Sequence, residues 1–313
     1  MEQIKTLVLC STSFAVPAIQ QLIQANMLAA IAVPEQSDET LQLLQSMMQG
    51  IDIPIIAIPA QHYDKALLKL MKQHDINLAL MLTFPYKLSV AVFGYPASGF
   101  YNFHPGPLPQ YRGPDPIFRQ IQNQEPYAGL CIHKVDASFD RGPVVLKEKI
   151  NIHPTDSYGT LTSKLSVVAA QMMLVLLKMI HLQIPIPNKA QDEKLATYFK
   201  RQTAADVTID WEVMPADGIV ALVNACNPWN KGAVAQINHK IVRICIAEKY
   251  ASGITTDVLP GTIIKTDSHQ LIVATINNEA LAIHFLHIEE GFLKAAQLLQ
   301  QGIKVGQQFQ HIK

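Results

Sequence analysis

Short apolar runs alternate with helix-like segments through the first 187 residues, and this alternation restricts the fold more than any other feature. The segments between the runs have helical spacing and polar caps, such as Ser11-Thr12-Ser13 before a helix that reaches Gln24. The pattern predicts an α/β fold with an open, mostly parallel, Rossmann-like sheet covered by helices on both faces. Four of the runs come before residue 100: Ile4 to Cys10, Leu28 to Val33, Ile53 to Ile58 and Asn77 to Leu82.

Further strands and helices complete this predicted sheet region, which we expect to end near Pro187 and so to span residues 1–187. The longest helix should be capped by Thr155 or Asp156. The strands are expected at Phe100 to His104, Leu130 to Val135 and Val144 to Ile150, the last two as antiparallel additions. The helices are expected at Thr40 to Met48, Tyr63 to His74, Pro116 to Gln122 and Thr155 to His181.

The chain changes character after residue 187. Residues 188–205 are polar and typical of a linker. We expect a small β-barrel domain over residues 206–313, which also contains a helix from Asp217 to Cys226 and a final helix from Phe292 to Gln301. The barrel is predicted from five short β-rich runs: Ala233 to Ile237, Ile241 to Ala247, Gly261 to Thr266, Gln270 to Thr275 and Ala280 to Ile288.

Composition argues against several classes of function. Lys plus Arg equals Asp plus Glu at 25 each, so the net charge indicates no polyanionic partner. The turn after the first strand lacks the glycines of a dinucleotide fingerprint, which argues against a nicotinamide enzyme. The four cysteines are scattered, with no CxxC pair, so we expect reduced thiols with no disulfide partner and no zinc.

We expect a cytoplasmic protein with no membrane partner. The N-terminus runs directly into a strand, without the cleavage site of a signal peptide. The most apolar region, Leu165 to Ile180, contains Gln171 and Lys178 and is too short to span a bilayer, so it predicts a buried helix.

The stretch from Gly99 to Gly142 holds the candidate chemistry. If residues 100–104 are extended, alternation places Asn102 and His104 on one face, about 6.6 Å apart along the strand. Three prolines after His104 end that strand, and open α/β sheets build their sites at such strand ends. A second apolar run leads to Asp140, which we expect to orient His104 beside the Asn102 amide. Taken alone, an Asn-x-His triplet is unspecific, and Asp140 is equally suited to a turn.

The complete string is far more specific than its parts. Asn102 to Pro105, Leu108-Pro109 and Tyr111 to Gly113, followed by Phe139 to Gly142, resemble the signature of the formyltransferases that use 10-formyltetrahydrofolate. The resemblance covers nearly the whole chain and implies a formyltransferase sheet domain followed by an OB-like barrel. Other blocks resemble the methionyl-tRNA branch of that family: Ser11 to Ala15, Ala196 to Tyr198, Ile209 to Trp211, Asn227 to Trp229, Gly232-Ala233, Pro260 to Ile263, Val273 to Thr275 and Gly306-Gln307.

The resemblance implies formyl transfer to a primary amine without a metal, with the family triad on Asn102, His104 and Asp140. The chemistry suits these residues, because the amide can donate to a developing oxyanion while the imidazole and carboxylate move a proton. His133 and His153 are expected to be surface or structural histidines. The folate is expected along Phe84, Pro85, Tyr86, Leu88, Phe139, Arg141 and Gly142, largely through backbone groups, and the acceptor near Ser11, Thr12, Arg112 and Asp115.

Two departures leave the acceptor open. The tRNA enzymes have a basic loop after the second strand, whereas residues 34–50 contain Glu35, Asp38 and Glu39 and no Lys or Arg. Residues 188–313 hold 12 basic and 12 acidic residues, without the excess that tRNA binding favours. Asp115 stands where those enzymes usually have small residues, and it suits an acceptor amine, a sugar hydroxyl or a helix cap.

Several interpretations therefore stay open. The acceptor is methionyl-tRNA, an amino-sugar nucleotide or a carrier-bound aminoacyl group. A formate-releasing hydrolase, and a catalytically idle folate-binding scaffold, are the alternatives to a transferase.

Overall fold

The computed structural model describes residues 3–251 and 258–310. It divides into two compact units, each described here by itself. The first unit consists of Met1–Pro116, Tyr127–Ile150 and Thr162–Phe199, and the second of Ile117–Pro126, Asn151–Leu161 and Lys200–Lys313. The division of the chain at 187/188 and 205/206 stays a prediction.

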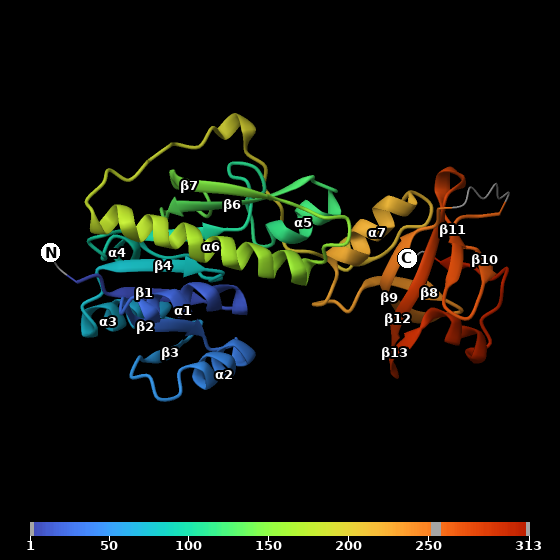
Figure 1. Ribbon diagram of the computed structural model, residues 1–313, viewed down its shortest axis with the longest axis horizontal. Coiled ribbons are helices and arrows are strands. Elements are labelled where there is room, and N and C mark those ends of the chain that lie inside the picture. The colour runs from blue at the N-terminus through green and yellow to red at the C-terminus, as the bar shows by residue number, and fades with distance from the viewer. Residues whose placement is uncertain (1–2, 252–257, 311–313) are drawn as a thin grey trace. The chain divides into compact units, whose positions relative to one another are not determined.

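A seven-stranded sheet, in the order β3-β2-β1-β4-β5-β6-β7, is the core of the first unit (Figure 1). The neighbours from β3 to β5 pair in parallel, and β6 runs antiparallel to β5. The predicted Rossmann-like α/β sheet with an antiparallel addition is therefore confirmed. Its strands are β1 (Thr6–Cys10), β2 (Leu28–Pro34), β3 (Ile55–Ile58), β4 (Leu78–Leu82), β5 (Phe100–His104), β6 (Tyr127–Lys134) and β7 (Val144–Asn151).

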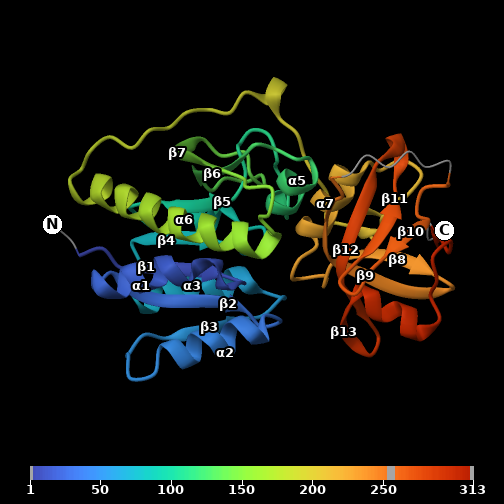
Figure 2. The ribbon, with the colours of Figure 1, turned by 45° about the vertical axis from the view of Figure 1, so that its right-hand side comes forward.

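Helices cover both faces of this sheet because the central strands are apolar on both sides. Leu7 and Leu9 of β1 pack with Leu67 and Met71 of α3 on one face, while α1 and α6 lie over the other (Figures 1 and 2). The helices of this unit are α1 (Val16–Gln24), α2 (Asp38–Met47), α3 (Tyr63–Gln73), α4 (Val90–Phe93) and α6 (Tyr158–His181), whereas α5 (Pro116–Gln122) belongs to the second unit from Ile117 on.

Helix α6 is long and apolar enough, by length and composition, to cross a membrane. In this fold, however, Leu165, Ala169, Met173 and Leu176 recur at helical spacing and are buried. The helix is therefore built like the core helix of a soluble protein. Its predicted cap is wrong: the Oγ of Ser157, not Thr155 or Asp156, accepts from the N–H of Thr160 at 3.2 Å.

The second unit contains a small antiparallel sheet, in the order β10-β11-β12-β9-β8-β14, with β13 paired to β12. Backbone hydrogen bonds from Ile263 to Gln307 and from Phe309 to Gly261 join the two ends of this sheet, as a barrel requires. The predicted small barrel is confirmed. Its elements are α7 (Ala216–Ala225), β8 (Ala233–Ile237), β9 (Lys240–Lys249), β10 (Ile263–Thr266), β11 (Leu271–Ala274), β12 (Ala280–Ile288), β13 (Gly291–Lys294) and β14 (Phe309–Gln310).

The predicted final helix is wrong in its first turn. A tight turn pairs Ile288 with Gly291, whose φ is +131°. Phe292–Lys294 then continue as strand β13 against β12. Only Ala295–Gln301 are helical, and they form a 3₁₀ helix. The tertiary pairing with β12 outweighs the helical spacing of the apolar residues in this segment.

Candidate functional site

Asn102 and His104 lie at the carboxyl end of β5, where the strand enters the proline-rich loop. Both side chains are nearly enclosed, with 8% and 4% of their surface exposed. Gly106 leaves room beside the imidazole, since a Cβ there would lie 2.8 Å from the Nε2 of His104. The amide and the imidazole therefore occupy a tightly packed position at the edge where α/β sheets bind ligands.

The His104 ring has two partners of different kinds. Its Nε2 lies 2.8 Å from the carbonyl oxygen of Tyr111, and because a carbonyl only accepts, Nε2 carries a proton in this arrangement. Its Nδ1 lies 3.5 Å from Oδ1 of Asp140. Burial lowers the pKa of His104, and the facing Asp140 carboxylate, which raises it, offsets only part of that effect.

Asp140 is held between two loops. Its Oδ2 accepts from the backbone N–H of Gly113 at 2.9 Å, and its side chain is 11% exposed. Burial raises its pKa, but His104, His133 and the Gly113 N–H outweigh burial and lower the pKa to about 2. An ionised carboxylate therefore faces the His104 imidazole.

His133 of β6 is part of the same cluster, although the sequence suggested only a surface or structural histidine. It is 2% exposed, and its Nε2 lies 2.9 Å from Nδ2 of Asn102. The same Nε2 is 3.8 Å from Oδ1 of Asp140. The available signal was a lone histidine that directly follows the apolar residues of β6, since a buried polar side chain needs a partner. His153, by contrast, is exposed and bonds Thr155.

Residues 189–199, here called the strap, bind the loop that carries Arg112. The Arg112 guanidinium donates through Nε and Nη2 to Oε1 of Gln191, at 3.2 and 2.8 Å. It also donates through Nη1 and Nη2 to the two carboxylate oxygens of Glu193, at 3.0 and 2.6 Å. Arg112 is only 3% exposed, so its guanidinium is buried against Gln191 and Glu193 of the strap. The structure therefore places the Arg112 guanidinium against the strap.

The strap also holds the Asp140 loop and the Tyr111 backbone. The Nε2 of Gln191 donates to the carbonyls of Asp140 and Gly142, both at 2.8 Å. The Oγ1 of Thr197 accepts from the N–H of Tyr111 at 2.9 Å. Tyr111 and Asp140 both have φ of +56°, a left-handed conformation that costs a non-glycine residue roughly 1 kcal/mol or more. The strap thus forms hydrogen bonds with the backbones of Tyr111 and Asp140, the two strained residues beside His104.

The opening turn after β1 meets the loop after β4. The Ser11 hydroxyl donates to the carbonyl of Thr83, and the hydroxyls of Thr12 and Thr83 lie 2.9 Å apart. Thr12 also caps the helical turn that leads into α1 by accepting from the N–H of Phe14. These hydroxyls are brought together at the carboxyl ends of β1 and β4, where the strand order reverses direction.

The residues expected along the folate differ in how far they are buried. Phe84 and Leu88 are buried in the core, and Tyr86 stacks on Tyr63 with ring centroids 4.8 Å apart. Pro85 and Arg141 are exposed, as is Phe139 at 47%. Gly142 is buried where a Cβ would overlap the carbonyl oxygen of Lys134, at 1.7 Å. The loop after β4 therefore presents backbone, rather than the Phe84 and Leu88 side chains, to any ligand.

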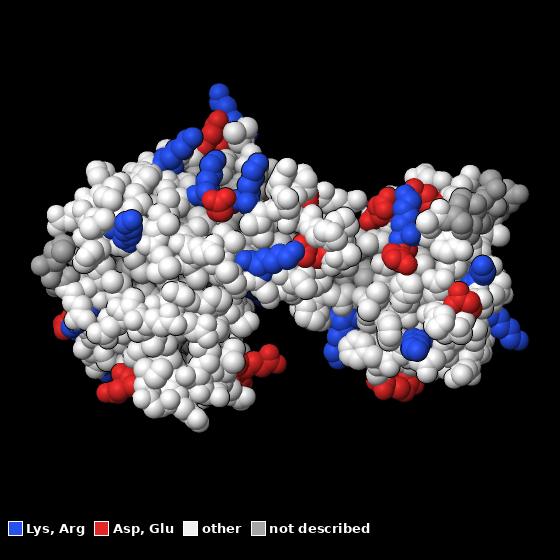
Figure 3. All heavy atoms as spheres, viewed as in Figure 1, with Lys and Arg blue, Asp and Glu red and all other residues white. Residues whose placement is uncertain are grey.

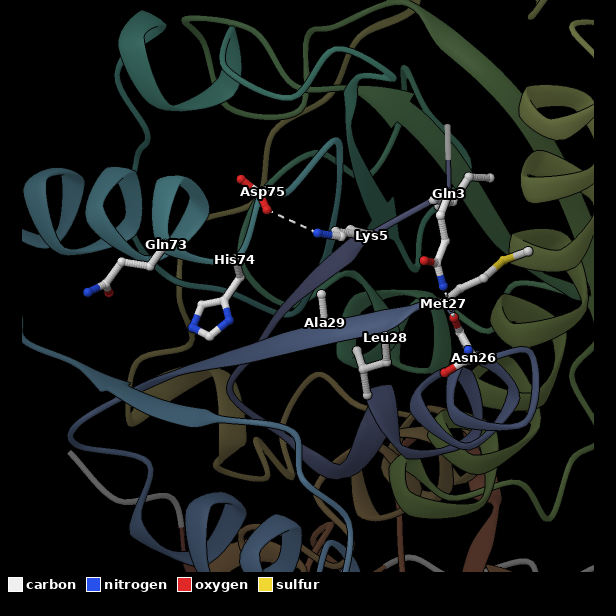
Figure 4. A pocket seen from close by; sticks show the side chains of 10 residues that line it. Gln3, Lys5, Asn26, Met27, Leu28, Ala29, Gln73, His74 and Asp75 are labelled. Carbon is white, nitrogen blue, oxygen red and sulfur yellow. Dashed lines mark hydrogen bonds and ion pairs between the residues drawn. The ribbon is translucent and has the colours of Figure 1, made fainter. Parts of the chain in front are cut away.

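A cavity of about 330 Å³ opens at the opposite, amino-terminal edge of the sheet (Figure 4). Its polar walls include Lys5 and Asp75, whose ion pair spans 3.0 Å. It contains none of the residues of the Asn102 cluster, so it does not belong to the candidate site. Among the residues that the structure describes, no group of three or more His, Cys, Asp and Glu side chains could hold a metal ion.

Comparisons with known proteins agree with this architecture. Residues 3–177 match the family described as formyl transferase, and residues 201–301 match the formyl transferase C-terminal domain. A methionyl-tRNA formyltransferase of Rickettsia prowazekii is 26% identical over 96% of this chain and 99% of its own length.

Two solved structures share the fold. HypX from Aquifex aeolicus, solved with tetrahydrofolic acid, superposes with a TM-score of 0.68 at 14% identity, over 97% of this chain and 48% of HypX. This chain thus spans about half the length of HypX. An N-formyltransferase from Helicobacter canadensis, solved with folinic acid and dTDP-3-aminofucose, superposes with a TM-score of 0.67 at 15% identity, over 90% and 99% of the two chains.

Proposed function

Because this chain belongs to the formyl transferase family, we propose that Asn102, His104 and Asp140 transfer a formyl group from 10-formyltetrahydrofolate to a primary amine. The observation that carries the proposal is the 3.5 Å approach of His104 to an ionised Asp140, beside the Asn102 amide at the same strand end. These groups supply a hydrogen-bond donor and a proton carrier, and amide formation on a bound formyl donor needs no more.

Each side chain has one task in this proposal. Asn102 donates an N–H to the formyl oxygen as it becomes an oxyanion. His104 takes the proton of the attacking amine at Nε2 and returns it to N10 of the folate as the bond from the formyl carbon to N10 breaks. This requires that Nε2 exchange its contact with the Tyr111 carbonyl for the amine and that the other proton of the ring lie on Nδ1. Asp140 faces that Nδ1–H as a hydrogen-bond acceptor and stabilises the imidazolium by its charge.

The residues present fit a folate donor, which supplies the activated formyl carbon on N10. The loop after β4 buries Phe84 and Leu88 and leaves its backbone for a flat heterocycle. The loop around Asp140 leaves Phe139 and Arg141 exposed, while Gln191 holds its carbonyls from behind. The burial of Phe84 and Leu88 supports a folate that is held largely through backbone groups of the loop after β4.

The transfer is tested by following tetrahydrofolate release from 10-formyltetrahydrofolate in the presence of candidate amines, with and without a chelator. We expect turnover that the chelator leaves unchanged, and a loss of about a hundredfold or more in His104→Ala. Unchanged turnover in His104→Ala, or abolition by the chelator, would refute the assignment.

For the acceptor, we propose a small or carrier-bound primary amine in preference to methionyl-tRNA. The loop between β2 and α2 supports this, since it is short and held in place. The Tyr86 hydroxyl donates to Oε1 of Gln36 at 2.6 Å, and the N–H of Glu35 donates to the carbonyl of Ile58 at 2.9 Å. The sequence has no Lys or Arg between Lys5 and Lys65, so this loop offers a nucleic acid no cation.

The charge distribution of the second unit supports the same choice. On the face seen in Figure 3, its basic and acidic side chains are interspersed. Lys249 is held by Asp217 at 2.8 Å and Glu279 at 2.5 Å, so this cation is already neutralised. The amino-sugar ligand in the Helicobacter canadensis relative gives one small acceptor class to try first.

Binding to initiator methionyl-tRNA at several salt concentrations tests the acceptor. We expect weak binding at physiological salt, because each neutralised phosphate adds close to one unit to the slope of log affinity against log salt. Submicromolar affinity with a slope steeper than about three would instead establish a tRNA-binding face and a methionyl-tRNA acceptor.

We further propose a cytoplasmic enzyme with reduced thiols. All four cysteines are free, three of them buried, and burial raises the pKa of Cys10 to about 12. Thiol titration of the denatured protein under non-reducing conditions should find four free thiols, and fewer would contradict a reducing compartment.

A further inference from the structure

His133 lies directly opposite Asn102 on the neighbouring strand. Strands β5 and β6 are antiparallel, and their register pairs Asn102 with His133 and His104 with Cys131. Side chains opposite each other on one face of such a pair are close enough to bond. The two polar side chains indeed meet, with 2.9 Å between Asn102 Nδ2 and His133 Nε2.

The hydrogen bonds of His133 fix where its proton lies. Its Nδ1 is 2.9 Å from the carbonyl oxygen of Lys134, which can only accept, so Nδ1 carries the proton. With the proton on Nδ1, Nε2 offers its lone pair to one N–H of the Asn102 amide. A reversed amide would instead place the Asn102 oxygen against that lone pair, which is unfavourable.

Gly142 and the strap keep this geometry in place. A Cβ at Gly142 would lie 1.7 Å from the Lys134 carbonyl oxygen and 3.2 Å from Nδ1 of His133, so only glycine leaves that bond undisturbed. The Gly142 carbonyl is in turn held by Gln191 at 2.8 Å. The Lys134 carbonyl, the His133 ring and the Asn102 amide therefore form a chain of fixed donors and acceptors.

We propose that His133 is a positioning residue for the transfer, because it holds the nitrogen, and not the oxygen, of the Asn102 amide on the His133 side. The second N–H of Asn102 is then left to donate to the reacting formyl oxygen. This inference rests on the proposed function. An oxyanion donor works only when its direction is set before the reaction, since reorientation during the step costs activation free energy. A purely structural histidine would need only some buried partner, not one with an accepting nitrogen at Nε2.

Two isosteric replacements separate these possibilities. In His133→Gln, the side-chain Oε1 reaches the position of Nε2 and can accept from Asn102. In His133→Asn, the shorter amide can replace only Nδ1, so the Lys134 bond survives and the Asn102 bond is lost. His133→Met keeps the volume without a comparable acceptor. His153→Asn is the control, because the His153 side chain is exposed and its ring bonds Thr155 of its own loop.

We expect His133→Gln and His153→Asn to keep kcat within about threefold of the parent. His133→Asn and His133→Met should lose about tenfold to a hundredfold in kcat with folate KM within about twofold, since a donor is misdirected rather than removed. Equal losses of kcat in Gln, Asn and Met variants, or no loss in any of them, would overturn the proposal.

A readout independent of turnover keeps this inference separate from the proposed function. In protein labelled with ¹⁵N at asparagine side chains, the Asn102 Nδ2 protons are identified by their disappearance in Asn102→Ala. They should be protected from solvent exchange in the parent and in His133→Gln, and lose at least about tenfold of that protection in His133→Asn. If no amine is formylated but this pattern holds, the proposed function fails while the positioning stands; unchanged protection in His133→Asn refutes the positioning.

Discussion

Two carboxylates, Asp140 in the sheet unit and Asp206 in the barrel unit, have the same lowered pKa of about 2 for different reasons. Both must overcome burial, which raises the pKa. Asp140 does so with two imidazoles and the Gly113 N–H. Asp206 does so with the Arg119 guanidinium at 2.8 Å and with the N–H and hydroxyl of Thr203, both at 2.8 Å.

The difference lies in the partners rather than in the carboxylates. Arg119 is permanently charged, so the Asp206 pair holds a single state and serves stability. The imidazole beside Asp140 has both a neutral and a protonated form, so that pair can serve proton transfer. A lowered pKa alone therefore does not distinguish a reactive carboxylate from a structural one.

The sharpest contrast should come from the same substitution at both sites. We expect Asp140→Asn to lower turnover by about a hundredfold or more with folate affinity little changed, because the charge that stabilises the His104 imidazolium is lost. Asp206→Asn should leave turnover within about twofold. Steady-state release of tetrahydrofolate measures both. Near-normal turnover in Asp140→Asn would make Asp140 a turn residue, and Asp136 would be the next carboxylate to replace.

Stability should show the reverse order. Asp206→Asn is expected to lower the free energy of unfolding by about 1–3 kcal/mol at pH 7, since it weakens the bonds to Arg119 and Thr203. A folded-state pKa of about 2, below the ordinary aspartate value of 3.8, stabilises the parent above about pH 4, and this contribution is lost as the pH falls towards 2. Urea unfolding at several pH values should therefore show a weaker acid dependence in Asp206→Asn; an unchanged one argues against the prediction.

The strap offers a smaller test of what holds Asp140. Gln191→Leu removes the bonds to the carbonyls of Asp140 and Gly142 and to Arg112. We expect roughly a tenfold loss in kcat with folate binding retained, because a small misplacement of a positioned group is costly. Glu193→Gln is the matched control on the same arginine, where Glu193 is 57% exposed and a change within about twofold is expected. Equal effects of the two variants would mean that the strap acts only through Arg112.

The pH dependence of kcat/KM gives the finest comparison. Burial lowers the pKa of His104, so the acid limb should fall below the ordinary histidine value of 6.5. Asp140 raises that pKa, so its loss in Asp140→Asn should move the limb to still lower pH, whereas Asp206→Asn should leave it in place. A limb that moves upward in Asp140→Asn would show that Asp140 is not the group facing His104 during catalysis.

Most strands and helices followed from local pattern because their residues satisfy one periodicity. Helix α5 and strands β8 and β12 have the bounds that the sequence predicted. Phe292–Lys294 did not, because helical spacing and strand pairing compete there and only the contact with β12 decides between them. The cap of α6 was misplaced by one or two residues for a similar reason, since Thr155, Asp156 and Ser157 are all suitable caps and their side chains bond different groups.

The sequence by itself determined the α/β sheet, the barrel, the family, and the shared face of Asn102 and His104, because these depend on periodicity and on a contiguous motif. Only the tertiary structure decided that His133 bonds Asn102 and that residues 189–199 hold the loops of Tyr111 and Asp140. Those contacts join residues 31 to 86 positions apart in the chain. No local pattern encodes such a pairing, because it depends on the register between β5 and β6 and on the path of a segment whose polar composition is that of a linker.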